Sequence, residues 1–350
     1  MSSIALISSR TQKKTLVTLF IFAALLLLLF QYRILSLLNK LGTNVTPIGT
    51  KFPIAFDFQH APQWLLPFYY TLDYLNLVWF TTLLGLLIAG AAVTFLPDFI
   101  QTRLQGNGLR AHVAGMILGI PNLFCTCCAA TTLPGLRRAG AGLGATLAFF
   151  VTAPALNIVV ILLAFQLLPL KLALLRTFLG VVAAIGVTYV VARLYPSVRL
   201  ESSISRCEVQ EDKGIGDLFY SWVINTWENA KVAIPLLVLG ILIVSVFKTV
   251  LPVETLVKNL GDGLMPTIVA AAVGTVVMVP TFTEVLWVGE FTKQGMGMGP
   301  AIALLITLPC VGLPSLWVLG RVFGSYRLAT TLGIGIFVLG IISGILFATI

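Results

Sequence analysis

Charged residues are scarce in this chain of 350 residues, and their scarcity excludes most classes of soluble protein. Only 10% of the residues are charged and 58% are hydrophobic, and the mean hydropathy is +1.01. A soluble globular domain carries about 25% charged residues. We therefore expect an integral membrane protein whose first partner is the lipid bilayer.

Other signals are missing as well. No long block of like charges occurs, so the net charge of +9 fits topology signals beside apolar segments better than a nucleic-acid partner. The histidines, His60 and His112, lie apart and are too few for a zinc site. No Walker motif occurs, so any energy source within this chain would be an ion gradient. No cofactor and no metal are expected.

A glycine- and proline-bearing pattern occurs twice, with its matching positions 155 residues apart. Two homologous membrane halves with interrupted apolar segments are typical of a transporter whose site lies between the repeats. The glycines alternate at period two, but no Lys-Ser/Thr follows them, which favours a tight turn or close packing over a phosphate loop. The first copy contains Gly140, Gly142, Gly144, Ala148, Thr152 and Pro154, and the second contains Gly295, Gly297, Gly299, Ala303, Thr307 and Pro309.

Several apolar stretches approach the roughly 20 residues that a spanning helix needs. The first, Thr15 to Leu38, is interpreted as a span rather than a signal peptide. We predict four parts: an N-terminal span and extracytoplasmic loop over 1–74, a first membrane repeat over 75–194, a cytoplasmic linker over 195–231 and a second repeat over 232–350. The later stretches run over 75–96, 111–136, 145–168, 170–192, 232–251, 266–289, 300–319 and 328–350.

Two stretches are interrupted by proline near the middle, at Pro121 in 111–136 and at Pro280 in 266–289. A break at membrane depth is tolerated where protein or a water-filled cavity satisfies the backbone. With a cytoplasmic N-terminus, the arginines stay cytoplasmic if both stretches turn back, whereas full crossings move several outside. Turning back is favoured and makes the repeats inverted; full crossing would make them parallel. The predicted fold is all-α and polytopic, with two homologous, inverted repeats and re-entrant or broken helices, in a bacterial-type inner membrane.

Three of the five cysteines are clustered in Cys125-Thr126-Cys127-Cys128, beside the first break. Thiol sulfur is a soft ligand that selects soft partners such as trivalent arsenic or copper(I). Helical spacing would bring Cys125 and Cys128 together, while an extended break would align Cys125 with Cys127. The alternative is that these cysteines only pack as small apolar residues.

Other candidate site residues are polar groups, prolines and a cysteine inside the apolar segments. Glu284 is a carboxylate well inside an apolar stretch, so it could carry a coupling proton, or it could lie near water or cap a half-helix. Asn157 could bind a freed backbone group or face the site. Pro154 and Pro309 are expected to break their helices at equivalent depths, or only to kink them. Cys310 could add a sulfur, although packing is the simpler interpretation.

The segment Gly119-Ile-Pro121-Asn-Leu-Phe124-Cys125-Thr126-Cys127, with Gly140 and Ala148 to Asn157 after it, is similar to the signature of a known family. It resembles the predicted-permease family that includes the organoarsenical efflux permease ArsP. The resemblance implies that Cys125 and Cys127 correspond to the paired cysteines of that family. Thr126 and Cys128 stand where the family usually has serine and glycine.

The leading hypothesis is a secondary transporter that exports a soft, thiol-reactive small solute such as a trivalent organoarsenical. A permease for another, unidentified solute is an alternative. A membrane thiol-disulfide oxidoreductase using Cys125 and Cys128 is a further alternative, but it would need a second cysteine pair to relay electrons. A non-transporting assembly subunit is the last alternative. The first two hypotheses predict no enzymatic activity.

Overall fold

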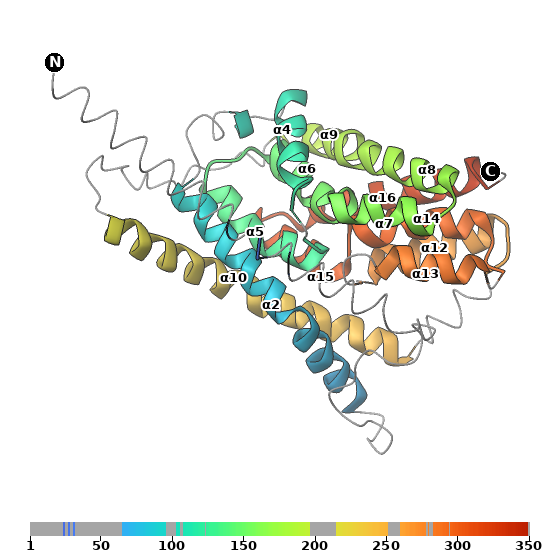
Figure 1. The fold of residues 1–350 in the computed structure, drawn as a ribbon, viewed down its shortest axis with the longest axis horizontal. Coiled ribbons are helices and arrows are strands. Elements are labelled where there is room, and N and C mark those ends of the chain that lie inside the picture. Colours follow the sequence, from blue (N-terminus) through green and yellow to red (C-terminus); the bar gives the residue numbers. More distant parts are fainter. Residues whose placement is uncertain are drawn as a thin grey trace.

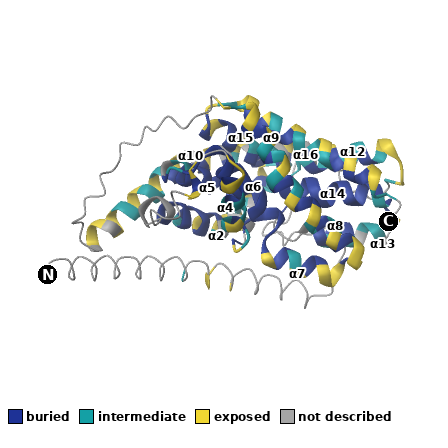
Figure 2. Cartoon of the chain, turned by 90° about the horizontal axis from the view of Figure 1, so that it is seen from above, coloured by how far each residue is buried: buried dark blue, intermediate teal, exposed yellow. Residues whose placement is uncertain are grey.

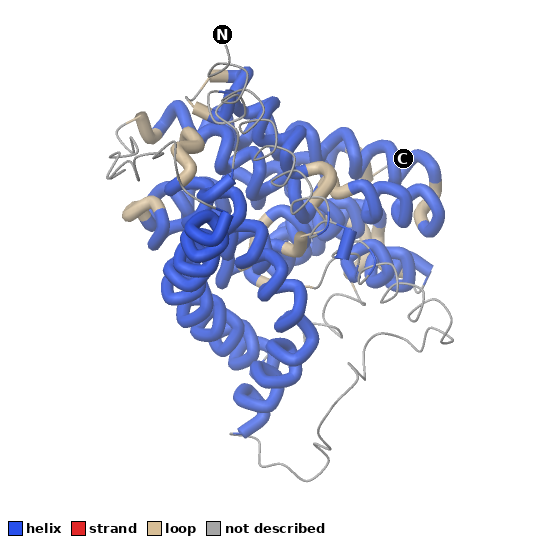
Figure 3. The backbone as a smooth tube through the Cα atoms, turned by 60° about the vertical axis from the view of Figure 1, so that its left-hand side comes forward, coloured by secondary structure: helices blue, strands red, loops and turns tan. Residues whose placement is uncertain are grey.

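The computed structural model describes residues 65–95, 103–105, 108–122, 124–196, 215–250, 260–277, 279, 283–293 and 295–348, with isolated positions between 24 and 31. In this part of the chain helices are the only regular secondary structure (Figure 3), which confirms the all-α class. Four helical segments are long and apolar enough to cross a membrane: Leu143–Leu167, Leu170–Leu194, Met298–Val322 and Tyr326–Leu346. The span expected at Thr15 to Leu38 lies, apart from isolated positions, outside the described residues.

Figure 1 shows the order and arrangement of the helices. In the first half they are α2 (Leu66–Phe95), α4 (Leu109–Gly119), α5 (Thr126–Arg138), α6 (Leu143–Ala155), α7 (Ile158–Leu167) and α8 (Leu170–Val181), which continues through the π-helical η2 (Val182–Val187) into α9 (Thr188–Leu194). In the second half they are α10 (Ile215–Val250), α12 (Leu264–Val276), α13 (Thr283–Lys293), α14 (Met298–Cys310), α15 (Leu313–Val322) and α16 (Tyr326–Leu346).

The helix boundaries repeat at the same spacing of 155 residues as the sequence pattern. Helices α14 and α15 lie 155 residues after α6 and α7 and have the same lengths, 13 and 10 residues. The turn before each also recurs, because Ala141 N–H donates to the Leu136 carbonyl at 3.0 Å and Met296 N–H donates to the Phe291 carbonyl at 2.9 Å. Gly140 and Gly295 adopt φ angles of 82° and 102° in these turns. The first glycine of each copy therefore forms a tight turn, and Gly144 and Gly299 pack closely against α4 and α12, so both predicted roles occur.

Helices α4 and α5 form a hairpin that turns back. Gly144 near the start of α6 lies against the His112 ring on α4, and Thr152 further along α6 lies against Gly119, so α4 and α6 run in the same direction. The short turn after α5 then leads directly into α6. Both ends of the hairpin consequently lie at the start of α6. The contacts of Thr267 with Gly299 and of Gly274 with Thr307 repeat this geometry for α12 and α13.

Helices α2 and α10 lie side by side and run antiparallel along one flank of the molecule (Figure 1). The Thr71 hydroxyl near the start of α2 donates to Ser245 Oγ near the end of α10 at 3.1 Å. Trp222 near the start of α10 donates from Nε1 to the Leu87 carbonyl, further along α2, at 2.8 Å. Helices α6 and α14 are buried at the centre, whereas α8 and α16 expose apolar faces (Figure 2). The pattern matches a bundle whose outer faces contact lipid.

Candidate substrate site at the helix breaks

Two broken helices pass through the centre of the protein. Pro154 and Pro309 occupy the penultimate positions of α6 and α14, which end at Ala155 and Cys310. Proline lacks the N–H that an α-helix uses and its ring displaces the preceding turn. A new helix begins within three residues of each end. In this structure each helix ends one residue after its proline, and each interruption lies halfway along a segment long enough to span the membrane.

The tip of the first hairpin meets the break between α6 and α7. Helix α4 ends just before Pro121, and the Ile120 carbonyl accepts a hydrogen bond from Ile158 N–H at 3.3 Å. The Asn157 side chain caps α7 by accepting from Val160 N–H at 2.9 Å. Its amide also donates to the carbonyls of Ala153 and Pro154, at 3.3 Å each. Asn157 therefore binds backbone freed by the break, which was one of the two predicted alternatives.

The thiols of Cys125 and Cys128 lie together at the hairpin tip. Cys125 is the extended residue before α5, with φ −80° and ψ 172°, and Cys128 follows in the first turn. Their sulfur atoms are 3.0 Å apart and buried. Of the two predicted pairings, this contact is the helical one between Cys125 and Cys128. Cys127 is also buried. Among the described residues, no group of three metal-ligating side chains forms.

A buried ion pair crosses between the two halves close to these breaks. Arg176 on α8 contacts Glu284 in the first turn of α13, with Nη2 and Oε1 3.1 Å apart. The two side chains are 1% and 2% exposed. Arg176 also donates from Nη1 to the Ala155 carbonyl, at the end of α6, at 3.0 Å. Glu284 is thus paired and buried, and lies at a half-helix N-terminus, where a negative charge is favoured.

The cost of disturbing this pair is large. Removing one partner of a buried ion pair typically destabilises a protein by about 3–5 kcal/mol, because the other charge remains without compensation. The Ala155 carbonyl belongs to the negative end of the α6 dipole and gives Arg176 a second partner. Arg176 was missed at the sequence level, although its position in the apolar run Leu170–Leu194 was a usable signal.

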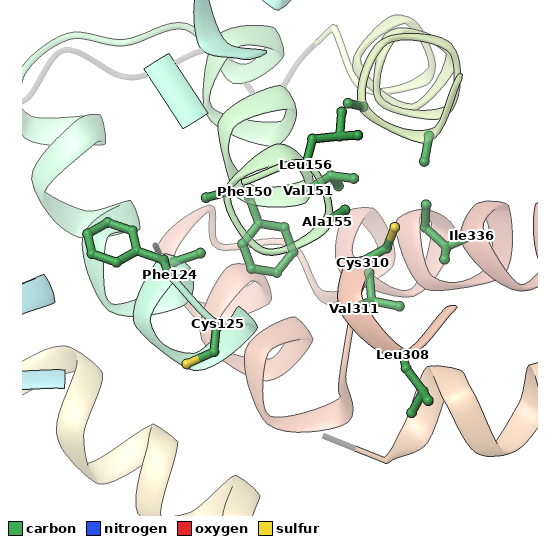
Figure 4. Close-up of a cluster of buried hydrophobic side chains, with 14 of the residues drawn as sticks. Phe124, Cys125, Phe150, Val151, Ala155, Leu156, Leu308, Cys310, Val311 and Ile336 are labelled. Atoms are coloured by element: carbon green, nitrogen blue, oxygen red, sulfur yellow. The ribbon is translucent and has the colours of Figure 1, made fainter. Parts of the chain in front are cut away.

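Cys310 and Pro280 complete the set of predicted site residues. Cys310 is fully buried at the end of α14 and lies within electrostatic reach of both Arg176 and Glu284. Figure 4 shows Cys310 and Cys125 on opposite sides of Phe150, so the fourth described thiol does not join the thiol pair. Pro280 lies outside the described residues. His112 is buried beside Tyr189, away from the breaks.

Comparison with known proteins identifies the family. The model of the ArsP-type predicted permeases matches residues 65–349. The chain belongs to the predicted permease family. This permease is 29% identical to the UPF0718 protein YraQ of Escherichia coli (strain K12) over 81% of each chain. It is 20% identical to the UPF0718 protein MJ0584 of Methanocaldococcus jannaschii, over 79% of this chain and 94% of that protein. No solved structure matches. The expected family is confirmed, and it favours a membrane transporter over an enzyme.

Some buried polar atoms of the permease have no protein partner, and four of them lie on the helices that form the hairpin tip, the first break and the ion pair. Buried polar groups in proteins almost always have partners. In the described part of the chain, buried side-chain atoms lacking one include Thr126 Oγ1 beside Cys125, Thr152 Oγ1 two residues before Pro154, and Arg176 Nε. Trp287 Nε1, one turn after Glu284 on α13, is another. Within the described part of the protein, these four atoms have no hydrogen-bond partner.

Proposed function

We propose that this permease is a secondary transporter that exports a soft, thiol-reactive small solute such as a trivalent organoarsenical. The observation that carries the proposal is the 3.0 Å contact between the Cys125 and Cys128 sulfurs at a buried hairpin tip. A monosubstituted trivalent arsenical reacts with two thiols: two arsenic–sulfur bonds replace its two arsenic–hydroxyl bonds, and two water molecules are released. Two adjacent soft ligands suit such a solute, whereas hard cations prefer oxygen. The solute would leave when thiols from outside the site replace Cys125 and Cys128 as its sulfur ligands.

The two halves are proposed to be inverted repeats that surround the transport pathway. The antiparallel packing of α2 and α10, whose equivalent positions differ by 155, supports this arrangement. Parallel repeats would instead bring Thr71 beside Thr226, its sequence equivalent. In a background without native cysteines, we expect oxidation to cross-link T71C/S245C but not T71C/T226C. Cross-linking of the second pair alone would refute the inverted arrangement.

The orientation follows from basic residues at one end of the bundle. Arg137 at the end of α5 donates to the Val322 carbonyl at the end of α15. The Tyr195 hydroxyl, after α9, donates to the Arg327 carbonyl at the start of α16 at 3.1 Å. We assign this basic end to the cytoplasm, together with the N-terminus, in a multi-pass arrangement of the bacterial inner-membrane type. Exposed basic residues at this end include Arg103, Arg110, Arg193 and Arg321.

The test is uptake of a trivalent organoarsenical into everted membrane vesicles. Wild-type protein is compared with C125S, C128S and C127S variants at equal expression, with empty vesicles as the background. We expect uptake to fall at least tenfold in C125S and C128S, since either change removes one of two ligands. C127S is the matched control because Cys127 neighbours the pair in sequence, and it should retain most activity.

Each outcome decides a separate part of the proposal. Equal loss in all three variants would support a three-sulfur site instead of a pair. Unchanged uptake in C125S and C128S would show that transport does not use these thiols. No wild-type uptake above background would reject the arsenical and leave the permease with another solute.

A further inference from the structure

The residues equivalent to Arg176 and Glu284 in the opposite repeats do not form an ion pair. The position equivalent to Glu284 is Ala129, and the position equivalent to Arg176 is Thr331. Structural packing that both halves share would use matching residues, as the glycine turns do. The ion pair is therefore an added feature of one side of the central region, and it connects α8 of the first half to α13 of the second.

Glu284 and Arg176 lie between two helix ends, so that full and partial charges alternate in sign along a row of four groups. The N-terminal end of α13 is partly positive, Glu284 is negative, Arg176 is positive, and the Ala155 carbonyl closes the negative end of α6. Each charge is stabilised by its neighbours only while α8, α13 and the end of α6 stay in contact. Neutralising Glu284 would remove the main partner of a buried guanidinium, whose Nε already lacks a protein partner.

Few other ionisable groups face the pair. Helix α13 packs against α7 and α14, and α8 packs against α6, α7, α14 and η2, which contains no ionisable residue. Helices α6 and α7 contain no ionisable residue, and α14 contains Cys310 alone. On α8 the remaining ionisable residue is Lys171, which is exposed. The side chains of Glu290 and Lys293 on α13 lie outside those described. Glu284 is consequently the carboxylate whose protonation state controls Arg176.

We propose that Glu284 is the proton-binding site of this permease and that Arg176 is the element that senses its occupancy. With Glu284 ionised, the pair joins α8 to α13 in the packing found in this structure. One proton added to the carboxylate breaks the ion pair and leaves Arg176 charged, with the Ala155 carbonyl as its remaining partner. Water must then reach the guanidinium, so the protonated protein adopts an opened, hydrated arrangement of α8 and α13.

This inference deepens the proposed function by naming its coupling ion. A proton that enters from the extracytoplasmic side and opens the centre can be exchanged for a solute that leaves the cytoplasm. No covalent chemistry is involved, because the carboxylate gains one proton from one side of the membrane and releases it to the other. The Arg176 guanidinium keeps its proton throughout.

Cys310 provides a test that needs no substrate, since it is fully buried at the end of α14, which packs against both α8 and α13. In a full-length variant with Cys125, Cys127, Cys128 and Cys207 changed to serine, its labelling by N-ethylmaleimide is followed from pH 8.5 to pH 5.5. Each rate is divided by that of the unfolded protein at the same pH, which removes the effect of thiol ionisation. We expect the normalised rate to rise on acidification, by up to about tenfold per pH unit for one linked proton.

Two variants assign the effect to the pair. E284Q should label rapidly at every pH. Because E284Q leaves Arg176 without its charged partner, R176Q/E284Q serves as a second variant with a neutral site and should also show no pH dependence. E228Q is the matched control, since Glu228 forms an exposed ion pair with Lys231 at 2.8 Å, and it should retain the full profile.

A pH-independent rate in the wild-type background would overturn the inference, as would an acid-dependent rate in R176Q/E284Q. Failure of the proposed function is recognised separately. Vesicles that take up no arsenical while Cys310 retains its Glu284-dependent profile would reject the solute and keep the proton site. Arsenical uptake together with a pH-independent Cys310 labelling rate would keep the proposed solute and reject the proton site.

Discussion

Gly119 on α4 lies directly against Thr152 on α6, so that a Cβ atom at position 119 would be 2.8 Å from the Thr152 Cβ. The equivalent residues of the second half, Gly274 and Thr307, make the same contact. Helices in membranes associate closely where glycine allows their backbones to approach. The contact holds the first arm of each hairpin against a broken helix and so fixes the depth of the hairpin tip.

Alanine at this contact should destabilise the permease. G119A forces a methyl group into a filled space, and overpacking of this kind costs about 1–3 kcal/mol. We expect a lower midpoint of thermal unfolding in detergent, and the same change for G274A. G186A is the matched control, because a Cβ there would meet only Val182 Cγ1 at 3.7 Å. An unchanged midpoint in G119A would contradict the close packing of α4 on α6.

Single and double substitutions of the buried ion pair should differ in stability. R176Q leaves Glu284 buried without its charged partner and should lower stability by about 3–5 kcal/mol. R176M/E284L removes both charges and should recover most of that loss, since apolar replacements of a buried pair are often neutral. The measurement is the unfolding midpoint in detergent for each variant. A double variant as unstable as R176Q would show that the charges are not balanced by each other.

The thiol pair should bind a monosubstituted trivalent arsenical with a defined stoichiometry. Phenylarsine oxide reacts with two neighbouring thiols, so purified wild-type protein should bind one equivalent at Cys125 and Cys128. Mass spectrometry of the intact protein gives the stoichiometry. C125S and C128S should lose the tightly bound equivalent, while C127S and C310S should retain it. Loss in C127S with retention in C128S would favour the family's pairing of Cys125 with Cys127 over the geometry found here.

Removal of the Asn157 cap should destabilise the break between α6 and α7. N157A deletes the acceptor for Val160 N–H, and the loss of a helix N-cap costs about 1 kcal/mol. N157S keeps a short oxygen acceptor and should lose less. Unfolding midpoints measure the difference, and organoarsenical uptake shows whether the cap also positions the site. Equal midpoints for N157A and N157S would argue against the capping role.

The sequence alone determined the features of this protein that depend on local chemistry. Proline and glycine act on the backbone within a few residues, so the breaks after Pro154 and Pro309 and the turns at Gly140 and Gly295 could be predicted. The 155-residue repeat and the scarcity of charge likewise identified a duplicated, helical membrane protein. The family signature lies within one continuous segment, which is why it could be recognised before the fold.

Tertiary structure decided the partners. Arg176 and Glu284 are 108 residues apart in the chain, and no local pattern indicates that α8 and α13 bring them within one ion-pair distance. Whether Cys125 faced Cys127 or Cys128 depended on where α5 begins, and Asn157 could face the site or cap a helix until the end of α6 was fixed. A side chain's neighbours across a bundle are set by helix packing, which the periodicity of a single segment does not contain.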